Sequence, residues 1–221
     1  MHQKSLSMNC KSTLNSGAVI TLFLLSAALY FFRGAIDCNN TLWLDFTKAF
    51  PVALLGITTW LIGKNKLLPI ALLLSACGDI AGEHGALITQ IAFFAAAHIA
   101  FICHFLRYRK FSRGRVISAI VWGIVMVIFG SFIVSHITST TISIACSIYI
   151  IIIGSMVAST LFIDSKCRFW YIAAALIFLF SDSCIAWNRF IDKFNGAGLV
   201  IMTTYFTAQL IFATLYLNDK K

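Results

Sequence analysis

The sequence predicts an all-α integral membrane protein, a bundle of eight transmembrane helices. Of the 221 residues, 60% are hydrophobic and only 11% are charged, a composition too apolar for a soluble domain with a polar surface. The apolar residues also fall into runs of about 20, the length that crosses a hydrocarbon core of about 30 Å at 1.5 Å per residue. We therefore expect the chain to lie in a lipid bilayer.

Eight apolar runs follow one another with short connections. We expect membrane helices at 17–33, 46–62, 67–82, 86–107, 114–134, 142–163, 169–188 and 198–217. Pro51 falls early in the second run, and a proline is tolerated in the first turn of a helix. No soluble segment or low-complexity linker separates the runs, so residues 1–221 are predicted to form a single transmembrane domain.

The positive charges predict the topology. The chain has 17 Lys and Arg against 8 Asp and Glu, but we expect no nucleic-acid partner, because the excess follows the positive-inside rule. With a cytoplasmic N-terminus and eight spans, the C-terminus is also cytoplasmic. That side then carries 13 of the 17 positive residues: Lys4, Lys11, Lys64, Lys66, Arg107, Arg109, Lys110, Arg113, Arg115, Lys166, Arg168, Lys220 and Lys221.

The two halves of the chain are similar in plan. Spans three and seven each run outward with a Ser-rich segment and an Asp near the end, and spans four and eight return with aromatic clusters. An offset of four helices preserves orientation, so the pattern suggests a parallel duplication of four helices about an axis along the membrane normal. Chance similarity between apolar helices is the alternative.

Two aspartates inside apolar spans are the strongest functional signal. Asp79 lies in the third span and Asp182 in the seventh. An ionisable group at membrane depth costs a few kcal/mol, so such groups mark functional sites. Each lies about 18 to 20 Å from the cytoplasmic edge at 1.5 Å per residue. Both are therefore predicted in one layer of the outer half. The alternative is a structural role, with each carboxyl paired to a cation or hydrogen-bonded to a carbonyl.

Several polar residues are predicted in the same layer by helical spacing. Glu83 follows Asp79 by four residues and Arg189 follows Asp182 by seven, so each lies on nearly the same face as its aspartate. Asn188 precedes Arg189. Tyr205 and Gln209 share a face of the eighth span.

Lys48 and His98 each have two interpretations. Lys48 opens the second span from the outer side, where its ammonium reaches the mouth of the site or snorkels to headgroups. His98 lies among alanines of the fourth span, a setting typical of a hydrogen bond between helices. Neither His-x-x-x-His nor His-Glu-x-x-His occurs, and the seven cysteines form no Cys-x-x-Cys pair. We therefore predict no metal, no cofactor and no disulfide framework.

Several segments resemble one known family. They are Lys48, Ser75-x-x-Gly78-Asp79, His98, Tyr149 with Met156, Phe180-Ser181-Asp182-Ser183 through Asn188-Arg189-Phe190, and Thr204-Tyr205-Phe206-Thr207-Ala208-Gln209-Leu210. In this order they are similar to the YhhN family of lysoplasmalogenase-like membrane proteins. The chain departs from the family in three places: Pro51 follows Lys48 by three residues where Lys-Pro is usual, Ala97 stands where Gly is common, and Phe101 stands where Tyr is expected.

The resemblance implies an eight-helix membrane hydrolase, in the cell or inner membrane if the source is bacterial. Such an enzyme cleaves the vinyl ether bond of lysoplasmalogens, lysophospholipids with an ethanolamine or choline headgroup, into a fatty aldehyde and a glycerophospho-alcohol. Asp79 and Asp182 are then the catalytic acid and base in either order. Lys48 and Arg189 are candidate phosphate contacts. Glu83 faces an ethanolamine ammonium, with Tyr205 or Trp187 adding a cation-π contact.

Two other functions fit intramembrane carboxylates. A proton-coupled transporter of small molecules or lipids uses them as a relay, but its helices are usually broken by Gly or Pro at the site, and only Gly78 stands beside an aspartate here. A lipid-binding protein without activity binds the same lysophospholipid or membrane lipids without consuming them.

Overall fold

The described residues form eight α-helices that run alternately up and down. The computed structural model describes residues 2–35 and 40–218, and the side chains of residues 17–34 and 40–218. The helices are α1 (His2–Phe32), α2 (Thr41–Ile62), α3 (Leu67–Glu83), α4 (Leu87–Leu106), α5 (Arg113–Ser135), α6 (Thr140–Leu161), α7 (Arg168–Phe190) and α8 (Ala197–Asn218), with a short 3-10 helix η1 (Arg33–Ala35) after α1. The described residues contain an isolated bridge but no strand, which confirms the all-α prediction for them.

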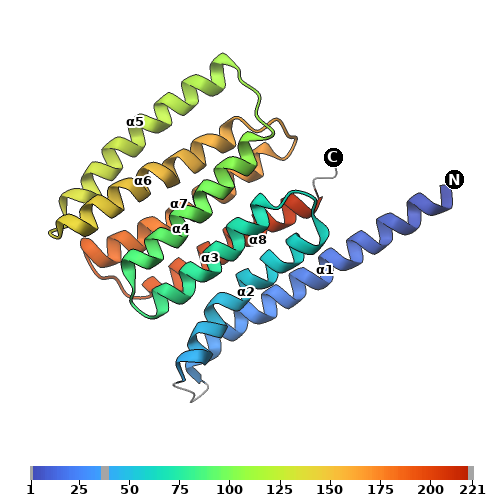
Figure 1. Cartoon of the computed structure of the whole chain (residues 1–221), viewed down its shortest axis with the longest axis horizontal. Coiled ribbons are helices and arrows are strands. Elements are labelled where there is room, and N and C mark those ends of the chain that lie inside the picture. The colour runs from blue at the N-terminus through green and yellow to red at the C-terminus, as the bar shows by residue number, and fades with distance from the viewer. Residues whose placement is uncertain (1, 36–39, 219–221) are drawn as a thin grey trace.

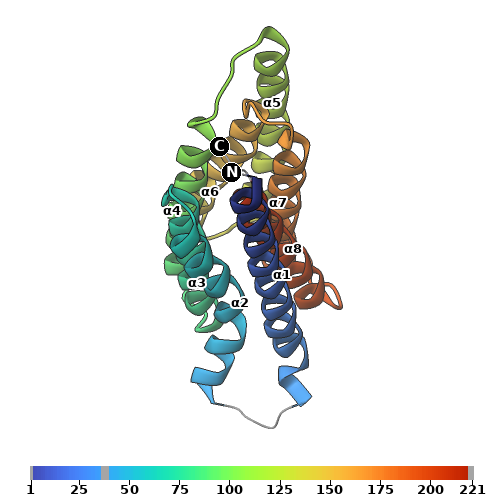
Figure 2. The same ribbon diagram turned by 90° about the vertical axis from the view of Figure 1, so that its right-hand side faces the viewer.

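The helices form one bundle with α1 and α5 at its opposite edges (Figure 1). The start of α1 and the end of α8 lie at the same end of the bundle, together with the α2–α3, α4–α5 and α6–α7 connections (Figures 1 and 2). This agrees with an even number of crossings. The cytoplasmic location of that end stays a prediction, and Lys220 and Lys221 lie outside the described residues.

Five helices, α4 to α8, are long and apolar enough to cross a membrane, and the apolar part of α1, Gly17–Phe32, is shorter. α2 carries Asp45 and Lys48 within its length, and α3 has only 17 residues. The count of eight spans therefore stays a prediction.

The second helix begins earlier than predicted. α2 starts at Thr41 because Asn40 caps it, its side chain accepting a hydrogen bond from the Leu42 N–H at 3.0 Å. Pro51 consequently lies inside α2, and its expected place in the first turn was wrong. Because proline has no N–H, the helix lacks one backbone hydrogen bond there.

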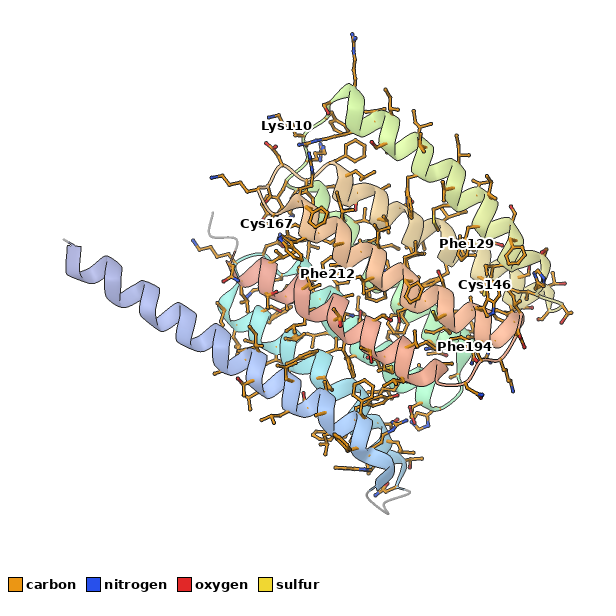
Figure 3. The ribbon with its side chains drawn as sticks, turned by 180° about the vertical axis from the view of Figure 1, so that it is seen from behind. Lys110, Phe129, Cys146, Cys167, Phe194 and Phe212 are labelled. Carbon is orange, nitrogen blue, oxygen red and sulfur yellow. The ribbon has the colours of Figure 1, made fainter. Side chains whose placement is uncertain are left out.

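Small and aromatic side chains fill the centre of the bundle. Ala97, Ala174 and Ala208 are fully buried, and such small residues let membrane helices approach closely. The ring of Phe101 lies 4.8 Å from that of Phe212, a residue in the second half of α8 that is labelled in Figure 3. The central cluster contains no buried residue of α5, so this helix is attached to the outside of the core.

Neighbouring helices repeat between the two halves. α1 packs on α2 as α5 packs on α6, α2 on α3 as α6 on α7, and α3 on α4 as α7 on α8; the pair α2 and α8 corresponds to α6 and α4. This arrangement agrees with the proposed parallel duplication, which stays a prediction.

Two connections are joined at the end of the bundle where the termini lie. The Lys110 N–H donates to the Phe162 carbonyl and the Asp164 N–H to the Tyr108 carbonyl, both at 2.8 Å. Arg115, in the first turn of α5, lies 3.6 Å from the Asp164 carboxylate. We call this junction of residues 108–110, 115 and 162–164 the loop clamp. It ties the beginning of α5 to the α6–α7 connection.

Candidate active site

Asp79 and Asp182 line one cavity. This space, which we call the polar cavity, has a volume of about 200 Å³ and also borders Lys48 and Tyr205. Its walls come from α1, α2, α3, α4, α7 and α8. Two carboxyl groups more than 100 positions apart in the sequence thus meet at one space inside the bundle.

The carboxyl of Asp79 is held by a tyrosine of α8. The Tyr205 hydroxyl donates to Asp79 Oδ2 at 2.7 Å, and Asp79 is only 3% exposed. The ring of Tyr205 meets Phe94 and Phe178 edge to face, with centroid distances of 6.0 and 5.4 Å. Gly78 leaves room for this packing, because a Cβ there would lie 2.9 Å from the Phe94 ring. The absence of a side chain at Gly78 therefore allows Phe94 to pack against Tyr205, the residue that holds Asp79.

The carboxyl of Asp182 is held by a second tyrosine and a histidine. The Tyr149 hydroxyl donates to Asp182 Oδ2, and His98 Nε2 lies 2.9 Å from the same hydroxyl and 3.6 Å from Asp182 Oδ2. A hydroxyl that donates to the carboxylate accepts from the imidazole, so His98 carries its proton on Nε2. His98 Nδ1 is buried and has no partner within the described part of the chain. His98 thus makes the contact between helices that its setting predicts.

Three charged residues form a cluster of ion pairs beside the polar cavity, and one of them, Lys48, lines it. Glu83 Oε2 lies 3.3 Å from Lys48 Nζ, and Glu83 Oε1 lies 3.1 Å from Arg33 Nη2. The Arg33 guanidinium also covers the ring of Tyr30 at 4.5 Å, and Tyr30 lines the cavity. We call Arg33, Lys48 and Glu83 the mouth triad. It joins α2, α3 and the residue after α1, and leaves one net positive charge.

A second space, which we call the apolar pocket, adjoins the polar cavity. Its volume is about 80 Å³, and aliphatic and aromatic side chains of α4, α5, α6 and α7 dominate its lining. Gln90, Phe94, Asp182 and Ile185 line both spaces. Asp182 therefore lies where the polar and the apolar lining meet.

Five of the predicted site residues do not themselves line the polar cavity: Glu83, His98, Asn188, Arg189 and Gln209. Arg189 is exposed and lines the apolar pocket. Asn188 accepts a hydrogen bond from the Phe194 N–H at 3.2 Å, which shapes the α7–α8 connection. Gln209 is fully buried beside Tyr205 and interacts with its hydroxyl group.

Sequence reasoning gave no site role to Tyr149, Arg33 or Tyr30. A signal for Tyr149 existed, because a phenol hydroxyl within the apolar run Ile148–Ile153 needs a polar partner in a membrane. For Arg33 the signal was its spacing of three residues from Tyr30, which places both on one helical face. Within the described chain, no three His, Cys, Asp or Glu residues come close enough to hold a metal ion.

The chain is similar to proteins of known name. The sequence model of the YhhN family matches residues 43–215. The chain is 28% identical to lysoplasmalogenase TMEM86B of Homo sapiens over 200 residues, which cover 86% of this chain and 82% of the human one. Identity to lysoplasmalogenase TMEM86B of Rattus norvegicus is 26% over 200 residues, covering 86% and 79%. No solved structure matches significantly. With its five long apolar helices, the protein is an integral multi-pass membrane protein.

Proposed function

Because the chain belongs to the YhhN family, we propose that it is a membrane-embedded hydrolase that cleaves the vinyl ether bond of lysoplasmalogens. The products are a fatty aldehyde and a glycerophospho-alcohol. The observation that carries the proposal is the polar cavity, where two carboxyl groups face a common space within a membrane bundle. The names of the mammalian relatives support the same reaction.

The chemistry requires a proton donor, a negative charge and water. One carboxylic acid gives its proton to the vinyl carbon that does not carry oxygen, which leaves an oxocarbenium ion. The other carboxyl, ionised, stabilises this cation and takes a proton from the water that adds to it. The resulting hemiacetal breaks its bond to the glycerol oxygen, releasing the aldehyde and the alcohol. Overall one water molecule is consumed, and the proton that the first carboxyl gives to carbon is matched by the proton that the second carboxyl takes from water.

The two tyrosines prepare the carboxyl groups for these roles. The Tyr205 hydroxyl occupies Oδ2 of Asp79 and the Tyr149 hydroxyl occupies Oδ2 of Asp182. In each case Oδ1 is the oxygen available to substrate or water. Fixed donors of this kind hold a reacting group in place before the reaction, so no reorganisation is needed during it.

The mouth triad suits the headgroup of a lysophospholipid. Arg33 and Lys48 offer N–H donors to a phosphate, and Glu83 offers a carboxylate to an ammonium group. Because Glu83 already pairs with both cations, a bound phosphate competes with Glu83 for them. Lys48→Met should raise KM about tenfold, the loss of one charge-assisted hydrogen bond of about 1.5 kcal/mol, with a smaller effect on kcat.

The decisive experiment measures aldehyde release. Purified protein receives a lysoplasmalogen and, in parallel, the acyl lysolipid with the same headgroup. We expect free aldehyde from the first lipid alone. A folded preparation that releases no aldehyde would contradict the proposal, and binding without consumption would indicate a lipid-binding protein.

Substitution of the carboxyl groups tests the mechanism. Asp79→Asn and Asp182→Asn keep the size of each side chain and remove its acid–base function, so each should abolish turnover. Gel filtration and thermal unfolding in detergent check that both variants are folded. If either Asn variant keeps most of the parental activity, the paired-carboxyl mechanism is wrong.

A further inference from the structure

We propose that the alkenyl chain of the substrate reaches Asp182 sideways from the bilayer, through a groove between α5 and α7, and lies in the apolar pocket during the reaction. The inference rests on the proposed function for the class of ligand, a single-chain lipid. It adds a binding site for the chain and a direction of access.

The groove between α5 and α7, which we call the lateral groove, has a volume of about 480 Å³. It shares Met126, Phe129, Leu179 and Ser183 with the apolar pocket. The apolar pocket in turn shares Asp182 with the polar cavity. The three spaces are therefore neighbours in a row, from the side of the bundle to the carboxyl group.

The linings of these spaces fit an aliphatic chain. Side chains such as Ile91, Ile150 and Ile153 border the apolar pocket and offer an apolar wall to the chain, beside the polar Asp182 and Arg189. Its volume holds only a few methylene-sized groups, so the rest of a fatty chain extends into the lateral groove. There Leu176, Phe180 and the other wall residues offer an apolar surface.

The lateral groove opens toward lipid. Val125 of α5 is 48% exposed, and Phe180 and Trp187 of α7 are 53% and 42% exposed, on a face of the bundle that no other described helix covers (Figure 3). At the polar cavity, by contrast, Lys48 lines the space and pairs with Glu83, which also pairs with Arg33. Moving a fatty chain through charged groups in water has no hydrophobic benefit, so the sideways route is favoured.

α5 is the helix that can move away from α7 at low cost. Only Met126, Gly130 and Ile133 of its residues are buried, all in the second half. In the first half, the Trp122 Nε1–H donates to the Gly154 carbonyl of α6 at 2.9 Å. α5 therefore packs mainly against α6 and makes few contacts with α7, which allows an alkyl chain to pass between α5 and α7.

Cysteine labelling tests the site without any turnover. Cys184 lines the lateral groove, whereas Cys77 and Cys103 are exposed on α3 and α4 and line neither of these spaces. In phospholipid nanodiscs, a membrane-permeant maleimide reacts with the native chain, and mass spectrometry follows each cysteine. The probe is a saturated ether lysophosphoethanolamine, which has the same headgroup and an alkyl chain but no vinyl bond.

We expect the saturated ether lipid to slow labelling of Cys184 about tenfold when present at about ten times its Kd, as single-site occupancy requires. Cys77 and Cys103 should react unchanged, and glycerophosphoethanolamine, which has no chain, should protect none of them. Equal labelling of Cys184 with and without the lipid overturns the inference.

A size substitution provides the second test. Leu179→Trp fills the boundary between the lateral groove and the apolar pocket, and Ile128→Trp adds the same bulk on the outward face of α5, where Ile128 is 67% exposed. Leu179→Trp should raise KM about tenfold for long-chain lysoplasmalogens and leave a short-chain lysoplasmalogen unaffected, since tenfold is about the effect of losing the burial of two methylene groups. Unchanged chain-length preference refutes the route.

The two tests separate this inference from the proposed function. Aldehyde release with an unprotected Cys184 keeps the hydrolase and rejects the lateral groove. Protection of Cys184 without any aldehyde release keeps the chain site and rejects the hydrolase.

Discussion

Replacing Tyr149 by Phe removes one oxygen atom and two hydrogen bonds. The hydroxyl donates to Asp182 Oδ2 and lies 2.9 Å from His98 Nε2. The direct separation of His98 Nε2 from Asp182 Oδ2 is 3.6 Å, which is too long for a hydrogen bond. The Phe variant therefore leaves both groups without the contact that orients them.

The size of the effect follows from the type of bond. A hydrogen bond to a charged group contributes about 1.5–3 kcal/mol, and each 1.36 kcal/mol of barrier is about tenfold in rate. If Tyr149 positions an ionised Asp182 for the reaction, Tyr149→Phe should lower kcat about 10- to 100-fold. KM should change much less, because the hydroxyl hydrogen-bonds to the carboxyl, and the Phe variant keeps the aromatic ring that lines the apolar pocket.

The assay is aldehyde release at saturating lysoplasmalogen, with thermal unfolding of the same preparations. Tyr216→Phe is the matched control, since the Tyr216 hydroxyl donates to the Asn65 backbone carbonyl at the other end of the bundle. It should lower stability while kcat stays near the parental value. Should Tyr149→Phe keep kcat within about twofold of the parent, or both variants lose activity equally, the positioning role is wrong.

Two further predictions concern packing and charge away from the site. A Cβ on Gly63 would lie 1.9 Å from Tyr216 Oη, so Gly63→Ala should cost about 1–3 kcal/mol of stability. Gly114→Ala is the control and should be neutral, because a Cβ there has no atom within 4 Å. Unfolding temperatures in detergent compare the two variants, and equal values would contradict the steric argument. Asp164→Asn removes the ion pair with Arg115 in the loop clamp and should lower the free energy of unfolding by about 0.5 kcal/mol or less. The difference from the parent should disappear in high salt, and a difference that persisted there would contradict the prediction.

The positions of the helices were largely predictable because a bilayer requires apolar runs of fixed length. The expected spans 114–134 and 169–188 agree with Arg113–Ser135 and Arg168–Phe190 to within two residues. The start of α2 was not predictable in this way. Its first turns precede the apolar run and depend on the Asn40 cap, a local hydrogen bond that hydropathy does not register.

The helical rise predicts a common depth for the site residues, and this stays a prediction, whereas their partners could not be predicted in this way. Spacing along one helix placed Arg189 near Asp182, and both residues line the apolar pocket, but Arg189 does not line the polar cavity. The pairing of Asp182 with Tyr149 joins residues 33 positions apart, and that of Asp79 with Tyr205 joins residues 126 apart. Such contacts depend on which helices become neighbours, and helical periodicity within one segment contains no information about that.

The loop clamp makes helix α5 sensitive to the salt concentration of the surrounding water. Arg115 and Met126 are about 16 Å apart along α5 at 1.5 Å per residue, and the half-exposed Asp164 is the acidic partner of Arg115. Salt weakens the attraction between these two groups, which is one of the contacts that hold the half of α5 without a buried residue. Ionic strength on the side of the termini should therefore change the rate at which a fatty chain enters the lateral groove, although the groove itself is apolar.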